Sequence, residues 1–390
     1  MRVLVVFDKF KDCMSSLQAQ HVAIQTLRKA RPTWEVQGMV LCDGGEGFAH
    51  TLTSAVQGEL RQCYVRSARA ENIQAFYGLV KVEKLDGSVK GELNLHGKSC
   101  LGVVEMAQAS GLQSLAPTER NVWETNSFGT GQLLMEAAHA GADVLLLGIG
   151  GSATHDLGLG ALQALGLELM DMDGKPLLNA SPLYWSKLCT LDSQKMRRLP
   201  PLWIASDVQN PLLGDQGAAY TYAKQKGASL EDLPRLEHAT EAVSRLMCTH
   251  FSKNMAMRDR PGMGAAGGIG FGLTLAQDAR VVSGATLVTG WLGLEKALAN
   301  VDLVITGEGR LDGSSLQGKG PGAVLNLAQR LGKQLWVVAG AVDNDAKQKL
   351  IQAFPEAHVL EMTPSDWPLE KALAQGPELL DQALMRILTQ

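Results

Sequence analysis

The N-terminal hydrophobic pattern alternates between the spacing of a strand and that of a helix. Residues 3–7 form an apolar run typical of a buried strand, and residues 15–30 carry apolar positions at helical spacing. A second strand is predicted over residues 34–42, followed by a helical stretch over residues 43–56 that opens with glycines. This order of elements favours a parallel sheet.

The central pattern predicts a different, mixed arrangement. Residues 62–66, 76–85 and 91–95 are short alternating runs broken by Asp86-Gly87, which indicates an antiparallel segment built on a turn. Beyond them we expect helices at 101–109, 130–140 and 233–251, strands at 144–149 and 202–205, and a glycine-rich turn into a helix after residue 149.

The C-terminal third returns to strand and helix alternation. Strands are predicted at 301–306, 335–339 and 358–362, with helices at 322–331 and 343–354. We therefore expect an α/β fold in which residues 1–60 and 282–390 form a Rossmann-like, doubly wound domain. Residues 61–281 would form an inserted second, mixed α/β domain, leaving an interdomain cleft where small ligands commonly bind.

Composition narrows the function classes. The chain has 390 residues, a formal net charge of −4 and a pI near 6.1, so it lacks the basic field typical of nucleic-acid binding. Its N-terminal apolar run is too short for a signal peptide or a membrane span, which predicts a cytoplasmic protein without a membrane partner. The six cysteines show no metal-ligand spacing and are interpreted as reduced thiols.

The first candidate for chemistry is a glycine cluster between a strand and a predicted helix. Gly150, Gly151 and Ser152 lie where free N–H groups and a helix dipole attract phosphate or carboxylate oxygens. The alternative is a merely tight turn. The cluster is not a nucleophile elbow, and no dinucleotide fingerprint follows the first strand, so hydrolase and NAD-dependent chemistry fit poorly.

A second candidate is an imperfect P-loop. Residues 313–319 have the spacing of the motif and end in Lys319, but Gly320 stands where the motif has serine or threonine. The stretch also begins several residues after its strand, which argues against a true P-loop. Lys319 remains a candidate phosphate contact, and the alternative is a solvated lysine.

Charged residues recur where strands are predicted to end. The carboxylates are Asp8, Asp43, Glu46, Asp207, Glu308 and Asp312, and the cations are Lys9, Lys11, Arg310 and Lys319. Sites in α/β sheets assemble at this edge, and phosphoryl transfer needs carboxylates for Mg²⁺, a group to orient the attacking hydroxyl, and cations for anionic substrates. For any single acid, the alternative is a helix cap or a surface charge.

Nine ordered stretches together resemble the bacterial class I glycerate kinase (glycerate 2-kinase) family over nearly the whole chain. They are Asp8-Lys-Phe-Lys11, Asp43-Gly-Gly-Glu-Gly47, residues 105–112, Gly129-Thr-Gly131, Gly150-Gly-Ser-Ala-Thr154 with Asp156, residues 207–212, Gln225-Lys-Gly227, residues 262–268, and Gly307-Glu-Gly-Arg310 with Asp312 and Gly318-Lys319. The resemblance implies ATP- and Mg²⁺-dependent phosphorylation of D-glycerate at the 2-hydroxyl.

Combining this resemblance with the strand-end positions, we assign hypothetical roles. Asp312, Asp207 and Lys11 are the catalytic candidates, with Asp312 orienting or deprotonating the hydroxyl. Asp8, Lys9 and Arg310 are the substrate-binding candidates, and Lys11 also contacts the substrate carboxylate. Gly150, Gly151, Ser152 and Lys319 would bind phosphate, and Asp43, Glu46 and Glu308, with Asp207 as a further candidate, would hold Mg²⁺. Asp207 or Asp8 could exchange roles with Asp312.

Four positions depart from the family pattern. Lys9 replaces a serine, His155 an asparagine, Leu157 a glycine and Ser314 a glutamine. These changes keep two alternatives open: a kinase for another small hydroxy acid, or a non-catalytic sensor of glycerate or nucleotide. A monomer or a homodimer is expected.

Overall fold

The chain divides into two compact units. The computed structural model describes residues 1–389 apart from 11–12, 42–43, 314 and 316–319. Unit 1 comprises residues 1–43 and 288–390, and unit 2 comprises residues 44–287. The sequence-based boundaries at 60 and 282 differ because helix α2 (Phe48–Ala55), expected in the first domain, packs on strands of unit 2.

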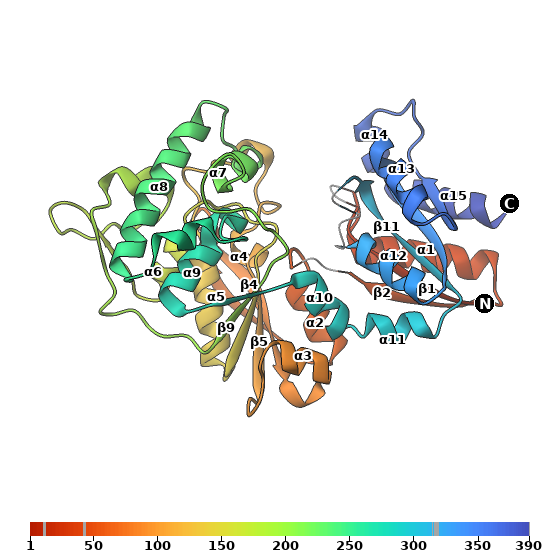
Figure 1. The fold of residues 1–390 in the computed structure, drawn as a ribbon, viewed down its shortest axis with the longest axis horizontal. Coiled ribbons are helices and arrows are strands. Elements are labelled where there is room, and N and C mark those ends of the chain that lie inside the picture. Colours follow the sequence, from red (N-terminus) through yellow and green to blue (C-terminus); the bar gives the residue numbers. More distant parts are fainter. Residues whose placement is uncertain (11–12, 42–43, 314, 316–319, 390) are drawn as a thin grey trace. The chain divides into compact units, whose positions relative to one another are not determined.

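Unit 1 is built on a five-stranded parallel sheet, as the N- and C-terminal patterns predicted (Figure 1). Its order is β13-β12-β11-β1-β2, with β1 (Arg2–Phe7), β2 (Glu35–Val40), β11 (Leu303–Leu311), β12 (Gln334–Val342) and β13 (Ala357–Glu361). The register pairs Phe7 with Val40 on one side and with Gly307 on the other. Chain connectivity runs outward in both directions from β1, which makes the sheet doubly wound and confirms the predicted α/β class.

Helices cover both faces of this sheet, because its strands are apolar at successive positions. Val3, Val5 and Phe7 face one core with α1 (Ser16–Ala30), α14 (Leu369–Ala374) and α15 (Gly376–Leu388). Leu4 and Val6 face the other core with α11 (Leu294–Ala299), α12 (Pro321–Arg330) and α13 (Asn344–Ala353). Side chains that alternate between two buried faces produce the continuous hydrophobic run seen in the sequence.

Unit 2 contains a six-stranded mixed sheet of order β10-β9-β6-β5-β4-β3. Its strands are β3 (Glu59–Arg66), β4 (Asn72–Lys81), β5 (Cys100–Glu105), β6 (Val144–Gly148), β9 (Leu202–Ala205) and β10 (Arg280–Val282). Strand β4 is antiparallel to its neighbours, whereas β5, β6, β9 and β10 are parallel. The other α-helices are α3 (Gly87–Glu92), α4 (Ala107–Ser110), α5 (Phe128–His139), α6 (Leu159–Ala164), α7 (Ala218–Tyr222), α8 (Asp232–His250), α9 (Ile269–Gln277) and α10 (Gly284–Trp291, across the boundary). A separate two-stranded antiparallel sheet pairs β7 (Glu168–Met170) with β8 (Thr190–Asp192).

Three sequence predictions in this unit are wrong. Residues 101–109 form strand β5 and a short helix, because neighbouring strands cover this buried run. Residues 91–95 form no strand: Asp86 caps α3, its carboxylate accepting the Ser88 N–H at 3.1 Å. The antiparallel turn therefore lies at residues 67–71, where Ser67 and Glu71 close the loop between β3 and β4.

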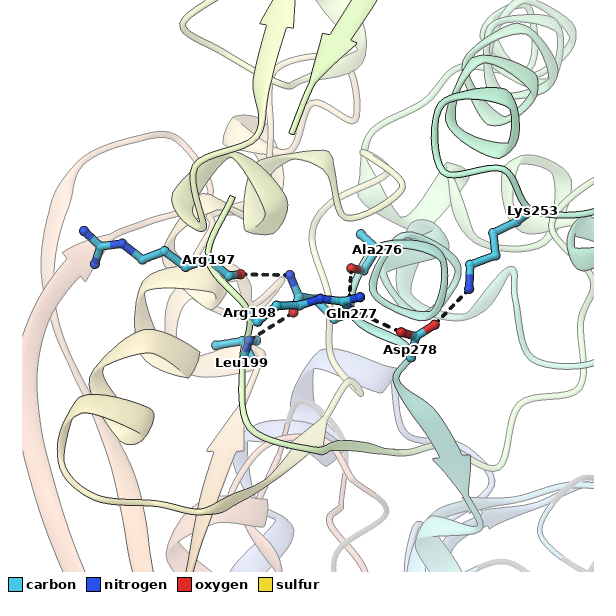
Figure 2. Close-up of polar contacts among 7 residues, drawn as sticks. All are labelled: Arg197, Arg198, Leu199, Lys253, Ala276, Gln277 and Asp278. Carbon is cyan, nitrogen blue, oxygen red and sulfur yellow. Dashed lines mark hydrogen bonds and ion pairs between the residues drawn. The ribbon is translucent and has the colours of Figure 1, made fainter. Parts of the chain in front are cut away.

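A buried glutamine joins the segments that lead into two of these strands. The Gln277 side chain accepts the Leu199 N–H at 3.0 Å and donates to the Arg197 carbonyl at 3.0 Å, as Figure 2 shows. Beside it, Asp278 accepts from Arg198 and from Lys253. These contacts align the starts of β9 and β10, which run parallel to one shared carboxyl edge.

Candidate functional site

In unit 1, five predicted site residues gather where β1 and β11 end. Asp8 and Lys9 follow β1, whereas Glu308, Arg310 and Asp312 lie in or just after β11. The two segments run side by side: the Asp8 N–H donates to the Gly307 carbonyl at 3.0 Å, and the Gly309 N–H to the Lys9 carbonyl at 3.4 Å.

This edge is the topological switch point of the sheet. The chain leaves β1 for α1 on one face, and it leaves β11 for α12 on the other. Connections that diverge in this way open a crevice at the carboxyl ends of the strands, which is where doubly wound sheets bind ligands. Fold and side-chain chemistry thus point to the same edge of unit 1.

The Asp8 carboxylate is packed tightly against the start of α12. One oxygen, Oδ1, accepts the Lys9 N–H at 2.7 Å. A Cβ added at Gly320 would lie 2.9 Å from Oδ2, and Gly320 has φ +45°, in a region that favours glycine. The serine or threonine of a P-loop would therefore be strained at position 320, which explains the glycine that breaks the motif.

Asp312 and Arg310 already have protein partners. The Ser315 N–H and hydroxyl donate to Asp312 Oδ1 at 3.3 and 3.5 Å, and Asp312 N–H donates back to the Ser315 hydroxyl at 3.0 Å. Arg310 Nη2 pairs with Asp343 Oδ1 at 2.7 Å, with the arginine side chain 70% exposed. Exposed ion pairs contribute at most about 1 kcal/mol, so a substrate anion can compete with Asp343 for Arg310.

In unit 2, strand β5 ends in a buried carboxylate, Glu105, which was not among the site residues predicted from the sequence. Glu105 is fully buried and accepts N–H groups from Gly47 and Ala49, each at 3.1 Å, at the start of α2. Burial raises the pKa of Glu105, and these hydrogen bonds oppose the increase. Glu105 thereby holds the loop that carries Glu46. Interpreting residues 101–104 as a strand would have placed Glu105 at a strand end.

The Gly150–Ser152 loop follows β6 at the same edge. Gly150 N–H donates to the Gly44 carbonyl at 2.9 Å and is already engaged. Among the residues that the structure describes, no protein group accepts the N–H of Gly151 or of Ser152. Gly151 has φ +71°, a left-handed conformation of the kind that forms anion-binding nests. Two of the three candidate N–H groups are thus available to an anion.

The predicted helix after this loop begins too far along the chain for its dipole to act on Gly150–Ser152. Helix α6 begins only at Leu159, and its first N–H groups already serve the protein's own carboxylate. Asp156 accepts from the Gly158 and Gly160 N–H groups at 3.2 and 3.0 Å, and from the Ser127 N–H and hydroxyl at 2.7 and 2.8 Å. The predicted helix does follow the glycine turn, but its first N–H groups are used by Asp156 and not by an external anion.

Glu46 and Asp207 are the other predicted carboxylates of this unit. Glu46 is half-buried, and a Cβ added at Gly151 would lie 2.6 Å from its Oε1, so the carboxylate lies against the glycine loop. Asp207 accepts the Ser283 hydroxyl at 2.7 Å and the Ala285 N–H at 2.8 Å, at the start of α10. Asp207 thus makes the helix-capping contacts that were the alternative to its catalytic assignment, which remains a prediction.

Two departures from the family pattern are buried beneath this loop. His155 Nε2 lies 2.9 Å from the Thr240 hydroxyl, which itself donates to the Leu236 carbonyl, so Nε2 must carry the hydrogen. Burial, together with the nearby Lys226 charge, lowers the pKa of His155 to about 3. Leu157 is fully buried with φ +55°, where glycine would be unstrained. Neither side chain reaches solvent.

A buried lysine lies under the same loop. Lys226 Nζ donates to the Ser152 hydroxyl at 2.9 Å and to the Thr154 carbonyl at 2.7 Å, and its side chain is essentially fully buried. Burial lowers the pKa of Lys226 to about 7, against the attraction of Asp156. The motif Gln225-Lys-Gly227 carried the family resemblance but suggested no role.

This shifted pKa predicts a pH-dependent stability. Between about pH 7 and the ordinary value of 10.5, the folded chain holds a neutral Lys226 and the unfolded chain a charged one, so unfolding takes up a proton. The free energy of unfolding should therefore rise with pH in this window, by up to about 1.4 kcal/mol per unit, relative to Lys226→Met. Urea unfolding at pH 7, 8 and 9 measures the slope. The exposed Lys224→Met is the control, and equal slopes in wild type and Lys226→Met would contradict the prediction.

Several assigned residues lie outside the described part of the chain. These are Lys11, Asp43 and Lys319, together with the departure at Ser314. Among the residues that are described, no group of three or more His, Cys, Asp and Glu side chains is arranged to hold a metal ion. No described helix is long and apolar enough to cross a bilayer.

Comparison with known proteins identifies the family. Residues 3–390 match the glycerate kinase family. The chain is 33% identical to the glycerate kinase of Halalkalibacterium halodurans, over 99% of this chain and 97% of that protein, and 34% identical to the glycerate 2-kinase of Escherichia coli, over 88% and 86%. A crystal structure described as a glycerate kinase 2 from Salmonella typhimurium LT2 aligns with a TM-score of 0.73 at 31% identity, covering 100% of this chain and 97% of that one. The sequence resemblance is thereby confirmed, and the chain belongs to the glycerate kinase family.

Proposed function

We propose that this protein transfers the γ-phosphoryl group of ATP to the 2-hydroxyl of D-glycerate, producing 2-phospho-D-glycerate and ADP. Membership of the glycerate kinase family supports the reaction class. The observation that carries the residue assignment is the switch point of unit 1, where β1 and β11 bring Asp8, Lys9, Glu308, Arg310 and Asp312 to one edge. Cationic and carboxylate side chains lie together there, which are the groups that phosphoryl transfer to a hydroxy acid requires.

On the acceptor side, Asp312 is the group assigned to the hydroxyl. Its Oδ1 is oriented by Ser315, and a carboxylate held in this way can accept the hydroxyl proton as the oxygen attacks. Arg310 and Lys9 would bind the glycerate carboxylate, with Arg310 exchanging Asp343 for the substrate. These contacts would fix the 2-hydroxyl for attack.

On the phosphate side, the N–H groups of Gly151 and Ser152 and the Ser152 hydroxyl would bind phosphate oxygens. The candidate ligands of Mg²⁺ remain Glu46, Glu308 and Asp43, since carboxylate oxygens are the ligands that Mg²⁺ prefers; Glu46 and Glu308 are half-buried. The ion, when bound, would offset negative charge on the transferred group. Asp207 is a weaker candidate ligand because both of its oxygens accept hydrogen bonds.

Product analysis tests this proposal. Purified protein is incubated with ATP, Mg²⁺ and D-glycerate, and the product is identified by ³¹P and ¹H NMR. The expected product is the 2-phosphate, with one ADP formed per glycerate consumed. A 3-phosphate would overturn the regiochemistry, and turnover only with other hydroxy acids would overturn the acceptor. A folded protein that consumes no ATP with any acid in a panel would favour the sensor alternative.

A further inference from the structure

The proposed function gives no role to the buried ammonium group of Lys226. Lys226 ends a short helical turn, and its backbone is fixed by Gly227, which has φ +94° and leaves no room for a side chain against the Arg120 carbonyl. Within the described part of the chain, the lysine ammonium has two hydrogen-bond acceptors, the Ser152 hydroxyl and the Thr154 carbonyl. Ser152 belongs to the loop proposed to bind phosphate, and Thr154 lies in the segment that continues directly from that loop.

Stability does not explain a lysine here. Burying an ammonium group is costly unless its hydrogen bonds and charge are well compensated, and an apolar side chain of similar size is often at least as stable. The opposite charge that attracts it, Asp156, already accepts four hydrogen bonds from Ser127, Gly158 and Gly160. His155, the other titratable group facing Lys226, is neutral because its pKa is about 3.

The direction of the hydrogen bond gives the lysine a function. An ammonium group can only donate, so it occupies a lone pair of the Ser152 oxygen and leaves the Ser152 hydrogen to point elsewhere. Donation from a cation also makes that hydroxyl a stronger donor. The adjacent N–H groups of Gly151 and Ser152 have no acceptor among the described residues. Three donors of one loop are therefore prepared for an anion.

We propose that Lys226 is a positioning residue, whose buried ammonium fixes the Gly150–Thr154 loop and directs the Ser152 hydroxyl as a donor to phosphate oxygens of the nucleotide. This inference rests on the proposed function, which supplies the phosphate, and adds a residue that does not itself touch the substrate. The lysine acts through Ser152, so removing either side chain should remove the same interaction.

A double-mutant cycle tests this coupling. Lys226→Met keeps the length of the side chain and removes its donors, and Ser152→Ala removes the hydroxyl. Each should lower kcat/KM for ATP on the order of 100-fold, as for loss of one preorganised donor. The kcat/KM of the double variant should equal that of the less active single variant, because both changes remove the same interaction. KM for D-glycerate should stay within about twofold in all three. Multiplying effects in the double variant, or losses confined to D-glycerate binding, would overturn the proposal.

Two further measurements separate positioning from a structural role. Lys226→Met should retain the wild-type midpoint in urea at pH 7, as should the exposed control Lys224→Met, whose activity should also be unchanged. Wild-type kcat/KM should fall above about pH 7, where Lys226 loses its proton and becomes an acceptor for Ser152, and Lys226→Met should lack this decline. A destabilised Met variant, or the same decline in both proteins, contradicts the inference.

Calorimetry with inorganic tripolyphosphate distinguishes failure of this inference from failure of the proposed function. Wild-type protein should bind the probe, and both single variants and the double variant should bind it about equally weakly. This binding pattern without turnover of D-glycerate would reject the proposed function and support Lys226 as the positioning residue. Turnover of D-glycerate by the wild type, with unaltered tripolyphosphate affinity in the variants, would support the proposed function and reject Lys226 as the positioning residue.

Discussion

The Asp312→Asn variant is expected to lose roughly 100- to 10,000-fold in kcat for D-glycerate, the range typical of a lost general base. Asparagine retains an oxygen that can accept the Ser315 N–H and hydroxyl, so the turn after β11 should be kept. It cannot accept the proton of the attacking hydroxyl. Steady-state kinetics over a range of ATP and D-glycerate concentrations should show a large change in kcat and a small change in both KM values.

The matched control for this variant is Asp302→Asn. Asp302 immediately precedes β11, pairs with Arg2 at 3.4 Å and lies at the opposite edge of the same sheet. The exposed pair is weak, so this change should leave kcat within about twofold of wild type. Full activity in Asp312→Asn would reject the role of Asp312 and direct attention to Asp8 or Asp207, which were the alternatives.

The Asp156→Ala variant is expected to unfold with about 3–5 kcal/mol less free energy than the wild type. Its carboxylate is fully buried and accepts four hydrogen bonds from three residues, Ser127, Gly158 and Gly160. Alanine would leave these donors buried without an acceptor and would release the starts of α5 and α6. Urea unfolding at pH 7 measures the loss.

The comparison for Asp156 is an exposed aspartate of the same unit. Asp173 is 68% exposed and its distance to Lys175 is 3.9 Å, so Asp173→Ala should change the free energy of unfolding by less than about 0.5 kcal/mol. Equal stability of the two variants would show that the Asp156 hydrogen bonds are replaced after mutation, most directly by water.

Local pattern predicted unit 1 well because both faces of its sheet are buried. Runs such as Val3 to Phe7 and residues 335–339 read as strands from their own composition, and the intervening helices carry one apolar stripe. Asp8 follows β1 as predicted, and Asp312 directly follows β11. Glu308 instead lies inside β11, because that strand extends to Leu311 and does not end at residue 306.

The secondary structure of unit 2 was harder to predict from the sequence, because its short apolar runs fit either a strand or a helix. Residues 101–104 form β5 because β4 and β6 pair with them, and that pairing involves residues far away in the chain. The same wrong assignment hid Glu105, whose position at a strand end follows only once β5 is recognised. Asp86-Gly87 was interpreted as a hairpin turn, but the same residues equally suit a helix cap, which is what forms.

Local periodicity and motif order were enough to predict the family, the α/β class, the doubly wound pairing of the two chain ends, and the strand-end position of most candidate charges. The contacts that those charges make depend on the three-dimensional arrangement of distant segments. Whether a carboxylate is a helix cap, as for Asp207, or the acceptor for two helix starts, as for Asp156, depends on which distant N–H groups reach it. The same holds for Lys226, because no residue near it in the sequence indicates that Ser152 and Thr154 will accept the hydrogen bonds of its buried ammonium group.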